Sequence, residues 1–152
     1  MVDERLQQSF WLSEFLRSDT AVRKGIDNRP KAVALANIRN VLAPGLQRVR
    51  NSLRVPVLIT SGYRCAELNR AVGSGDSSQH LQGLAVDFVA PDFGTPRAIC
   101  KHLLERAPEI RFDQLIFEGT WVHISFAPAT PRGQVLTAHF MGGQVTYSKG
   151  LV

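Results

Sequence analysis

The chain has 152 residues, a length typical of one globular domain with a full hydrophobic core, and we expect residues 1–152 to form a single domain. Hydrophobic residues make up 44% of the chain and charged residues 20%, which excludes a disordered or collagen-like protein. The formal charge of +5 favours an anionic partner. Because the basic residues are not interleaved with aromatic ones, we expect no nucleic-acid binding.

No apolar run approaches the ~18 residues of a membrane span, so we expect no stable membrane insertion. Residues 1–5 carry acidic side chains and no apolar segment typical of a signal peptide follows them, which predicts synthesis in the cytoplasm without a signal peptide. Cys65 and Cys100 lie in apolar or helical patterns and are expected to be reduced core thiols. With no heptad pattern and no long exposed apolar edge, we expect a monomer.

The N-terminal third of the chain is predicted to be helical. A short amphipathic helix is expected over residues 9–16, with turn or cap residues at 18–20 and a loop at 26–30. Apolar residues then recur at helical spacing over 33–53, which predicts one long helix perturbed at Pro44-Gly45.

Short β-branched runs dominate the rest of the chain. The predicted strands cover residues 55–60, 84–90, 114–117, 121–126, 135–140 and 144–147. Between them we expect a short helix over 66–72, a polar loop over 73–79, and a helix capped by Thr95 that ends near residue 106. Helices first and an antiparallel meander later predict an α+β fold, with N-terminal helices packed on a central antiparallel sheet.

Three residues suggest a metal site. His80, Asp87 and His123 supply two imidazoles and one carboxylate, a set that leaves a fourth tetrahedral position for water, as in catalytic zinc sites. Asp87 lies inside an apolar strand, where a carboxylate without a cation or several donors costs several kcal/mol. The spacing alone does not decide between a metal site and ordinary polar side chains that are hydrogen-bonded within the protein.

Three separated sequence motifs favour the metal site over the interpretation of these residues as ordinary polar side chains. They are S-G-Y-R at 61–64, S-Q-H-L-Q-G-L-A-V-D at 78–87 and W-V-H-I at 121–124. In this order they resemble the zinc D-Ala-D-Ala carboxypeptidase family, which includes bacterial carboxypeptidases, dipeptidases and phage endolysins that cut the peptide stems of peptidoglycan. The resemblance covers residues 55–126 and implies a small α+β fold whose antiparallel sheet carries a zinc site.

The resemblance also implies roles for individual residues. His80, Asp87 and His123 would bind Zn²⁺, and Arg64 would orient the substrate through charge-assisted hydrogen bonds. Ser78 and Trp121 match motif positions and are expected to contact the substrate. Gly83 is also part of the second motif and would permit a backbone conformation that a Cβ atom prevents.

The resemblance implies that the general base is an acidic or imidazole group a few residues before the last histidine. Glu118 precedes His123 by five residues, and a tight turn at Gly119-Thr120 would place its carboxylate on the same sheet face. Asp113 and Asp76 are the alternative bases. His102 and His139 match no motif and are expected to be packing or surface residues.

These expectations describe a zinc metallopeptidase that hydrolyses the peptidoglycan stem peptide, of the D-Ala-D-Ala carboxypeptidase or the L-Ala-D-Glu endopeptidase type. Without a signal peptide, it would be a phage or prophage endolysin that acts on the cell wall, in the periplasm, after its release. The alternative is a non-catalytic zinc-binding module of the same fold, which also resembles the hedgehog signalling domain. Such a module would bind the wall or form part of a phage particle.

Overall fold

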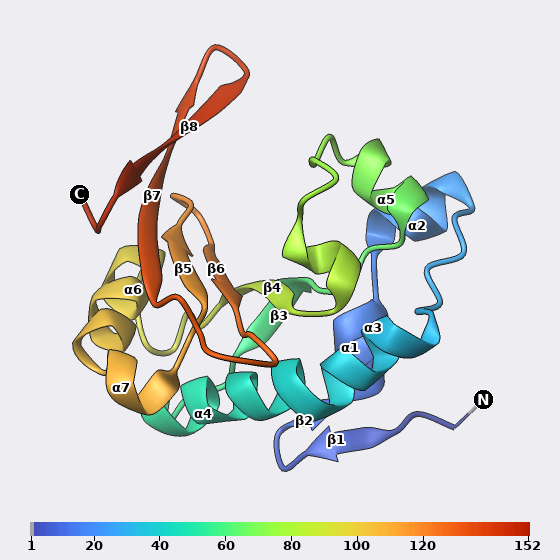
Figure 1. Ribbon diagram of the computed structural model, residues 1–152, viewed down its shortest axis with the longest axis horizontal. Helices are drawn as coiled ribbons and strands as arrows, with labels where there is room; N and C mark the ends of the chain where they lie inside the picture. Colours follow the sequence, from blue (N-terminus) through green and yellow to red (C-terminus); the bar gives the residue numbers. More distant parts are fainter. Residues whose placement is uncertain (1) are drawn as a thin grey trace.

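The computed structural model describes residues 2–152 and combines helices with a six-stranded sheet and a small two-stranded sheet (Figure 1). The helical elements are α1 (Leu12–Leu16), α2 (Asp19–Lys24), α3 (Ala32–Asn37), the π-helix η1 (Ile38–Leu42), α4 (Ala43–Leu53), α5 (Ala66–Ala71), the 3₁₀-helix η2 (Gln79–Gln82), α6 (Pro96–Glu105) and α7 (Ala107–Ile110). The strands are β1 (Arg5–Gln7), β2 (Phe10–Trp11), β3 (Leu58–Ser61), β4 (Ala85–Val89), β5 (Gln114–Phe117), β6 (Val122–Ser125), β7 (Gln134–Met141) and β8 (Gln144–Lys149). The predicted α+β class is confirmed.

The large sheet has the strand order β3-β4-β6-β5-β7-β8. All neighbours are antiparallel except β5 and β7, which run parallel, so the predicted antiparallel sheet is in fact mixed. The chain returns from the end of β6 to the start of β5, where Asp113 holds it: the backbone N–H groups of Arg132 and Gln134 donate to the Asp113 side chain and carbonyl. Strand β7 therefore starts beside the first residue of β5.

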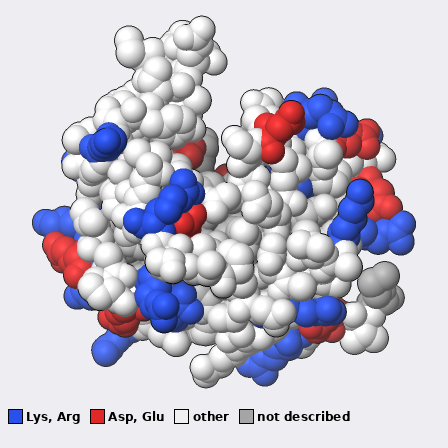
Figure 2. Space-filling view, in the orientation of Figure 1, with Lys and Arg blue, Asp and Glu red and all other residues white. Residues whose placement is uncertain are grey.

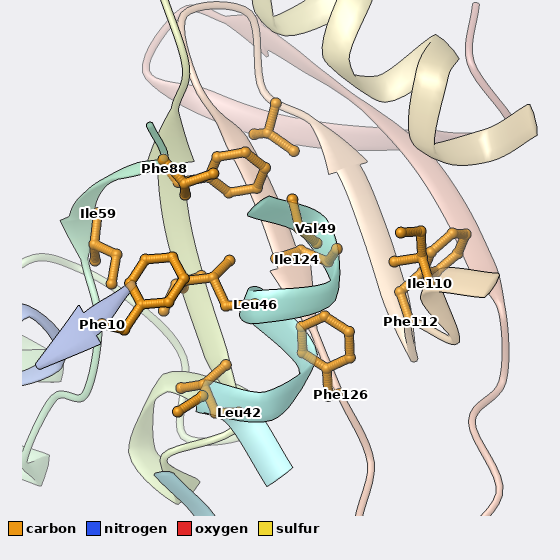
Figure 3. Packing of buried hydrophobic residues seen from close by; sticks show 14 of the residues in the cluster. Phe10, Leu42, Leu46, Val49, Ile59, Phe88, Ile110, Phe112, Ile124 and Phe126 are labelled. Atoms are coloured by element: carbon orange, nitrogen blue, oxygen red, sulfur yellow. The ribbon is translucent and has the colours of Figure 1, made fainter. Parts of the chain in front are cut away.

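Helix α4 packs its apolar side against the sheet (Figure 3). Leu46 and Val49 from this helix are fully buried together with Phe88 of β4 and Ile124 of β6. A Cβ atom on Gly45 would lie 2.5 Å from the Phe126 ring, so the absence of a side chain here lets that ring pack against the helix. The alternate residues of β4 and β6 consequently face away from the helical layer.

The predicted helix over 33–53 is continuous, but it changes form before the proline. Residues 38–42 make a π-helical turn in which the N–H of Ala43 donates to the carbonyl of Ile38, and α4 then begins with Pro44 in its first turn. Proline has no N–H and its ring crowds the carbonyl four residues earlier, which favours a widened turn at this point.

The N-terminal predictions were partly wrong. Residues 5–7 and 10–11 pair as strands, so α1 begins at Leu12 rather than at residue 9. Ser18 is a cap residue, as predicted, and its Oγ accepts from the N–H of Ala21 at 3.2 Å, but the helix that it begins, α2, was not predicted. Both features depend on local capping and pairing that apolar spacing does not reveal.

Both cysteines are free thiols, as predicted, although only Cys100 is fully buried. Burial raises the pKa of the Cys100 thiol to about 12 and keeps it protonated. Cys65 is half-buried and its Sγ accepts from the N–H of Leu68 at the start of α5. Over residues 2–152, no helix has both the length and the apolar character needed to cross a bilayer.

Candidate metal centre

His80, Asp87 and His123 meet on the sheet face opposite α4. Asp87 and His123 are directly paired across β4 and β6, while His80 comes from η2, just before β4. Each of the three offers one ligand atom, and these atoms all lie within 4.8 Å of one another. The sequence motifs, 36 residues apart between Asp87 and His123, are brought together by this strand pairing.

The ligand atoms are arranged around the Asp87 carboxylate. Its Oδ1 lies 3.3 Å from His80 Nε2 and 3.0 Å from His123 Nδ1. Tetrahedral zinc with bonds of ~2.0–2.1 Å requires ligand atoms about 3.3 Å apart. The two separations from the Asp87 carboxylate and the chemistry of this donor set therefore fit a zinc ion.

The protonation states also suit a metal. Burial lowers the pKa of His80, which favours the neutral imidazole that a metal requires. For Asp87, burial alone would raise the pKa, but the close contacts with His123 and His80 outweigh it and lower the pKa overall. A neutral imidazole beside an ionised carboxylate is the form in which both groups bind zinc.

Arg64 lies beside the three ligand residues. Its Nη2 is 3.5 Å from Asp87 Oδ2, while its Nε donates to Ser61 Oγ and its Nη1 to Asn69 Oδ1. The side chain is largely buried, and burial lowers its pKa while the charges of Asp87 and Glu118 partly oppose this. These contacts fix a guanidinium at the edge of the metal site.

Glu118 faces the same space from the end of β5. Its backbone N–H donates to the Trp121 carbonyl at 3.1 Å across the Gly119-Thr120 turn, as predicted. Since Ile116 pairs with His123, Glu118 shares a sheet face with that histidine. Burial and, secondarily, the negative charge of Asp87 raise the pKa of Glu118.

A cleft of about 690 Å³ joins these groups, with His80, Asp87 and His123 on its floor and Arg64 and Glu118 along it. Figure 2 shows the molecule hollowed between the projecting β7–β8 hairpin and the lobe that carries α5. The volume is within the ~300–1,000 Å³ usual for small-ligand sites.

Ser78 and Trp121 also line this cleft. The Oγ of Ser78 accepts from the backbone N–H of His80 at 3.3 Å, so this serine also begins the helical turn that presents the histidine. The Nε1 of Trp121 is buried and has no hydrogen-bond partner among residues 2–152, which leaves a donor free for another group.

The two alternative general bases and the two remaining histidines do not line the cleft. Arg132 binds Asp113 through both its Nε and its Nη2, and this holds the pKa of Asp113 down, at about 2. Asp76 is exposed and does not line the cleft. His102 contacts Ser52 and His139 contacts Ser148, both away from the candidate metal centre.

Sequence reasoning missed one wall of the cleft. Leu136 and Phe140 of β7 and Val145 and Tyr147 of β8 line it, and none of them belongs to the three motifs. Alternation of apolar residues along 134–141 and 144–149 could have indicated that one face of these strands is used.

A sequence profile of the Peptidase M15 family matches residues 8–125, more than half of the chain. Comparison with curated protein sequences finds no match. The matched range contains every residue of the candidate metal centre and of the three motifs, together with Arg64 and Glu118. The chain therefore belongs to the M15 family of peptidases, the zinc D-Ala-D-Ala carboxypeptidase family that its motifs resemble.

Proposed function

We propose that this protein is a zinc-dependent peptidase that cuts peptide bonds in the stem peptide of peptidoglycan. The observation that carries the proposal is the position of a three-ligand donor set, a half-buried carboxylate and a fixed guanidinium along one cleft. A metal-assisted hydrolysis needs these three elements and requires no serine or cysteine nucleophile.

His80, Asp87 and His123 would hold the zinc. When bound, zinc supplies the acidity that brings a coordinated water to a pKa of ~7 and the positive charge that polarises a carbonyl. The Gly62 carbonyl accepts from His80 Nδ1 at 2.7 Å, which keeps the Nε2 lone pair directed at the metal position.

Glu118 would act as the general base and then as the general acid. Its carboxylate accepts a proton from the attacking water and passes it to the leaving amine as the peptide bond breaks. A pKa raised by burial suits both steps, because such a group takes up and releases a proton more evenly near neutral pH.

Arg64 would bind the substrate oxygen that becomes negatively charged. Its guanidinium is held by Ser61 and Asn69, so little side-chain freedom is lost when substrate binds. The formal charge of +5 favours approach to an anionic cell wall. The endolysin role stays a prediction.

The proposal is tested by incubating purified peptidoglycan with wild type and with His123→Ala, each with and without a chelator. Mass spectrometry of the released fragments is expected to show new stem-peptide termini with wild type in the absence of the chelator, but not with the chelator or with His123→Ala. These termini identify the bond that is cut. His139→Ala, a histidine substitution outside the cleft, serves as the control and should release the same fragments as wild type. One bound zinc per chain without fragment release from any wall type would instead favour a non-catalytic module.

A further inference from the structure

The β7–β8 hairpin has an unusual surface. Residues 133–148 contain no Lys, Arg, Asp or Glu, although such residues make up 20% of the whole chain. Four large side chains on the hairpin are nevertheless well exposed: Phe140 at 55%, Met141 at 78%, Val145 at 42% and Tyr147 at 51%. Figure 1 shows the hairpin standing out from the body of the molecule, next to β5 in the sheet that carries the metal site.

Strand register places three of these side chains on the cleft side. Leu136 pairs with Ile116, which itself pairs with His123, so Leu136 shares the sheet face of that histidine. Along β7 and β8, the pairs Ala138–Tyr147 and Phe140–Val145 continue the same face. All but the small alanine line the 690 Å³ cleft.

This wall is continuous with the candidate active site. The Phe140 ring lies 6.1 Å from the Trp121 ring, between centroids. Tyr147 lines the same cleft, and burial, then the charges of Glu118 and Asp87, raise its pKa. The hairpin is therefore part of the cleft near the position of bond cleavage.

The opposite wall has a different chemistry. It is formed by the loop at residues 73–79, from which Ser74, Ser77 and Ser78 line the cleft, and by Arg64. A bound peptide would thus meet hydroxyl and guanidinium groups on one side and aromatic and aliphatic groups on the other. Such a cleft fits an extended chain that presents polar groups to one wall and an apolar side chain to the other.

We propose that Phe140, Val145 and Tyr147 form a specificity wall that binds the methyl group of an alanyl residue next to the scissile bond. This inference rests on the proposed function, because both candidate stem-peptide bonds, D-Ala-D-Ala and L-Ala-D-Glu, include an alanyl residue. The wall lies beyond residue 125, outside the range that the family profile matches. It would add substrate selectivity to the metal site.

Binding is tested without turnover, in zinc-loaded protein carrying Glu118→Gln. Calorimetry with the purified stem peptide is expected to give a Kd about tenfold weaker when Phe140→Ala and Tyr147→Ala are added. Met141→Ala is the matched control, since this exposed side chain is on the same hairpin, pairs with Gln144 and does not line the cleft. An equal Kd in the wall variant and its parent would overturn the inference.

Selectivity gives a second readout in the active enzyme. One buried methyl group corresponds to about fourfold in kcat/KM, so wild type should prefer the alanyl peptide over its glycyl analogue by about that factor. The preference should disappear in Phe140→Ala/Tyr147→Ala and return in Phe140→Leu/Tyr147→Phe. A fourfold preference that persists in the alanine variant contradicts the wall, whereas a wild type that binds the peptide but cleaves none contradicts the proposed function.

Discussion

His80 and Gly62 are joined by a hydrogen bond of 2.7 Å from the imidazole Nδ1–H to the backbone carbonyl. A second bond returns from the Arg64 N–H to the His80 carbonyl at 3.1 Å. These two contacts tie the S-G-Y-R motif to the motif that contains the histidine. They orient the ring and select the tautomer whose Nε2 faces Asp87.

Replacement of His80 by alanine should weaken zinc binding more than 100-fold, because removal of a supporting group alone typically costs 10–100-fold. His139→Ala, on β7 and hydrogen-bonded to Ser148, should leave the affinity unchanged. Competition with a chromogenic chelator measures the zinc affinity of both variants. Equal zinc affinity in His80→Ala and wild type would exclude this residue as a ligand.

Glu118→Gln should lower kcat by about 10²–10⁴-fold while one zinc stays bound, since it removes proton transfer but keeps the side-chain size. Glu109→Gln is a suitable control because Glu109 is exposed on α7, away from the cleft. Steady-state hydrolysis of the stem peptide and metal analysis provide the two readouts. A Glu118→Gln enzyme with unchanged kcat would assign the base to another group.

The ionisation of Glu118 should depend on zinc. Burial and the Asp87 charge disfavour the carboxylate, so in the metal-free protein its pKa should exceed the ordinary value of 4.5. A bound cation favours the carboxylate, and zinc should therefore lower this pKa. Carboxyl carbon NMR over a pH series measures both states, with Glu118→Gln identifying the signal. A pKa below 4.5 in the metal-free protein would be inconsistent with the half-buried position of Glu118 beside Asp87.

Gly83→Ala should destabilise the protein by roughly 2–4 kcal/mol. Its φ of +71° disfavours a side chain, and a Cβ atom would lie 2.5 Å from the Ala34 carbonyl oxygen. Gly119 has a similar φ of +79° but nothing within 4 Å, so Gly119→Ala should cost only about 1 kcal/mol. Urea unfolding compares the two, and equal losses would show that the contact with Ala34 does not matter.

The sequence motifs were sufficient to predict which residues gather at the candidate site. Asp87 could be singled out before any motif was considered, because a carboxylate within an apolar strand needs a partner, whereas His123 was assigned through its motif. The Gly119-Thr120 turn fixed the relation of Glu118 to Trp121 through local chemistry alone. These features were predictable from local residue type, whereas the β1–β2 pairing and the helix capped by Ser18 were not.

The pairing of strands that are far apart in the sequence was not predictable from the sequence pattern. The parallel pairing of β5 and β7 depends on contacts between Asp113 and the Arg132–Gln134 segment, which no periodicity reveals. The cleft wall formed by Phe140 and Tyr147 depends on that same pairing. A register shift of one residue would have turned both side chains to the other face.

The central claim is tested most directly by titrating zinc into metal-free protein while following fragment release from purified peptidoglycan. The rate should rise with each addition and reach a plateau at one zinc per chain, and His123→Ala should show no rise over the same range. A chain that binds no zinc, or one that releases fragments equally well without it, would contradict the account.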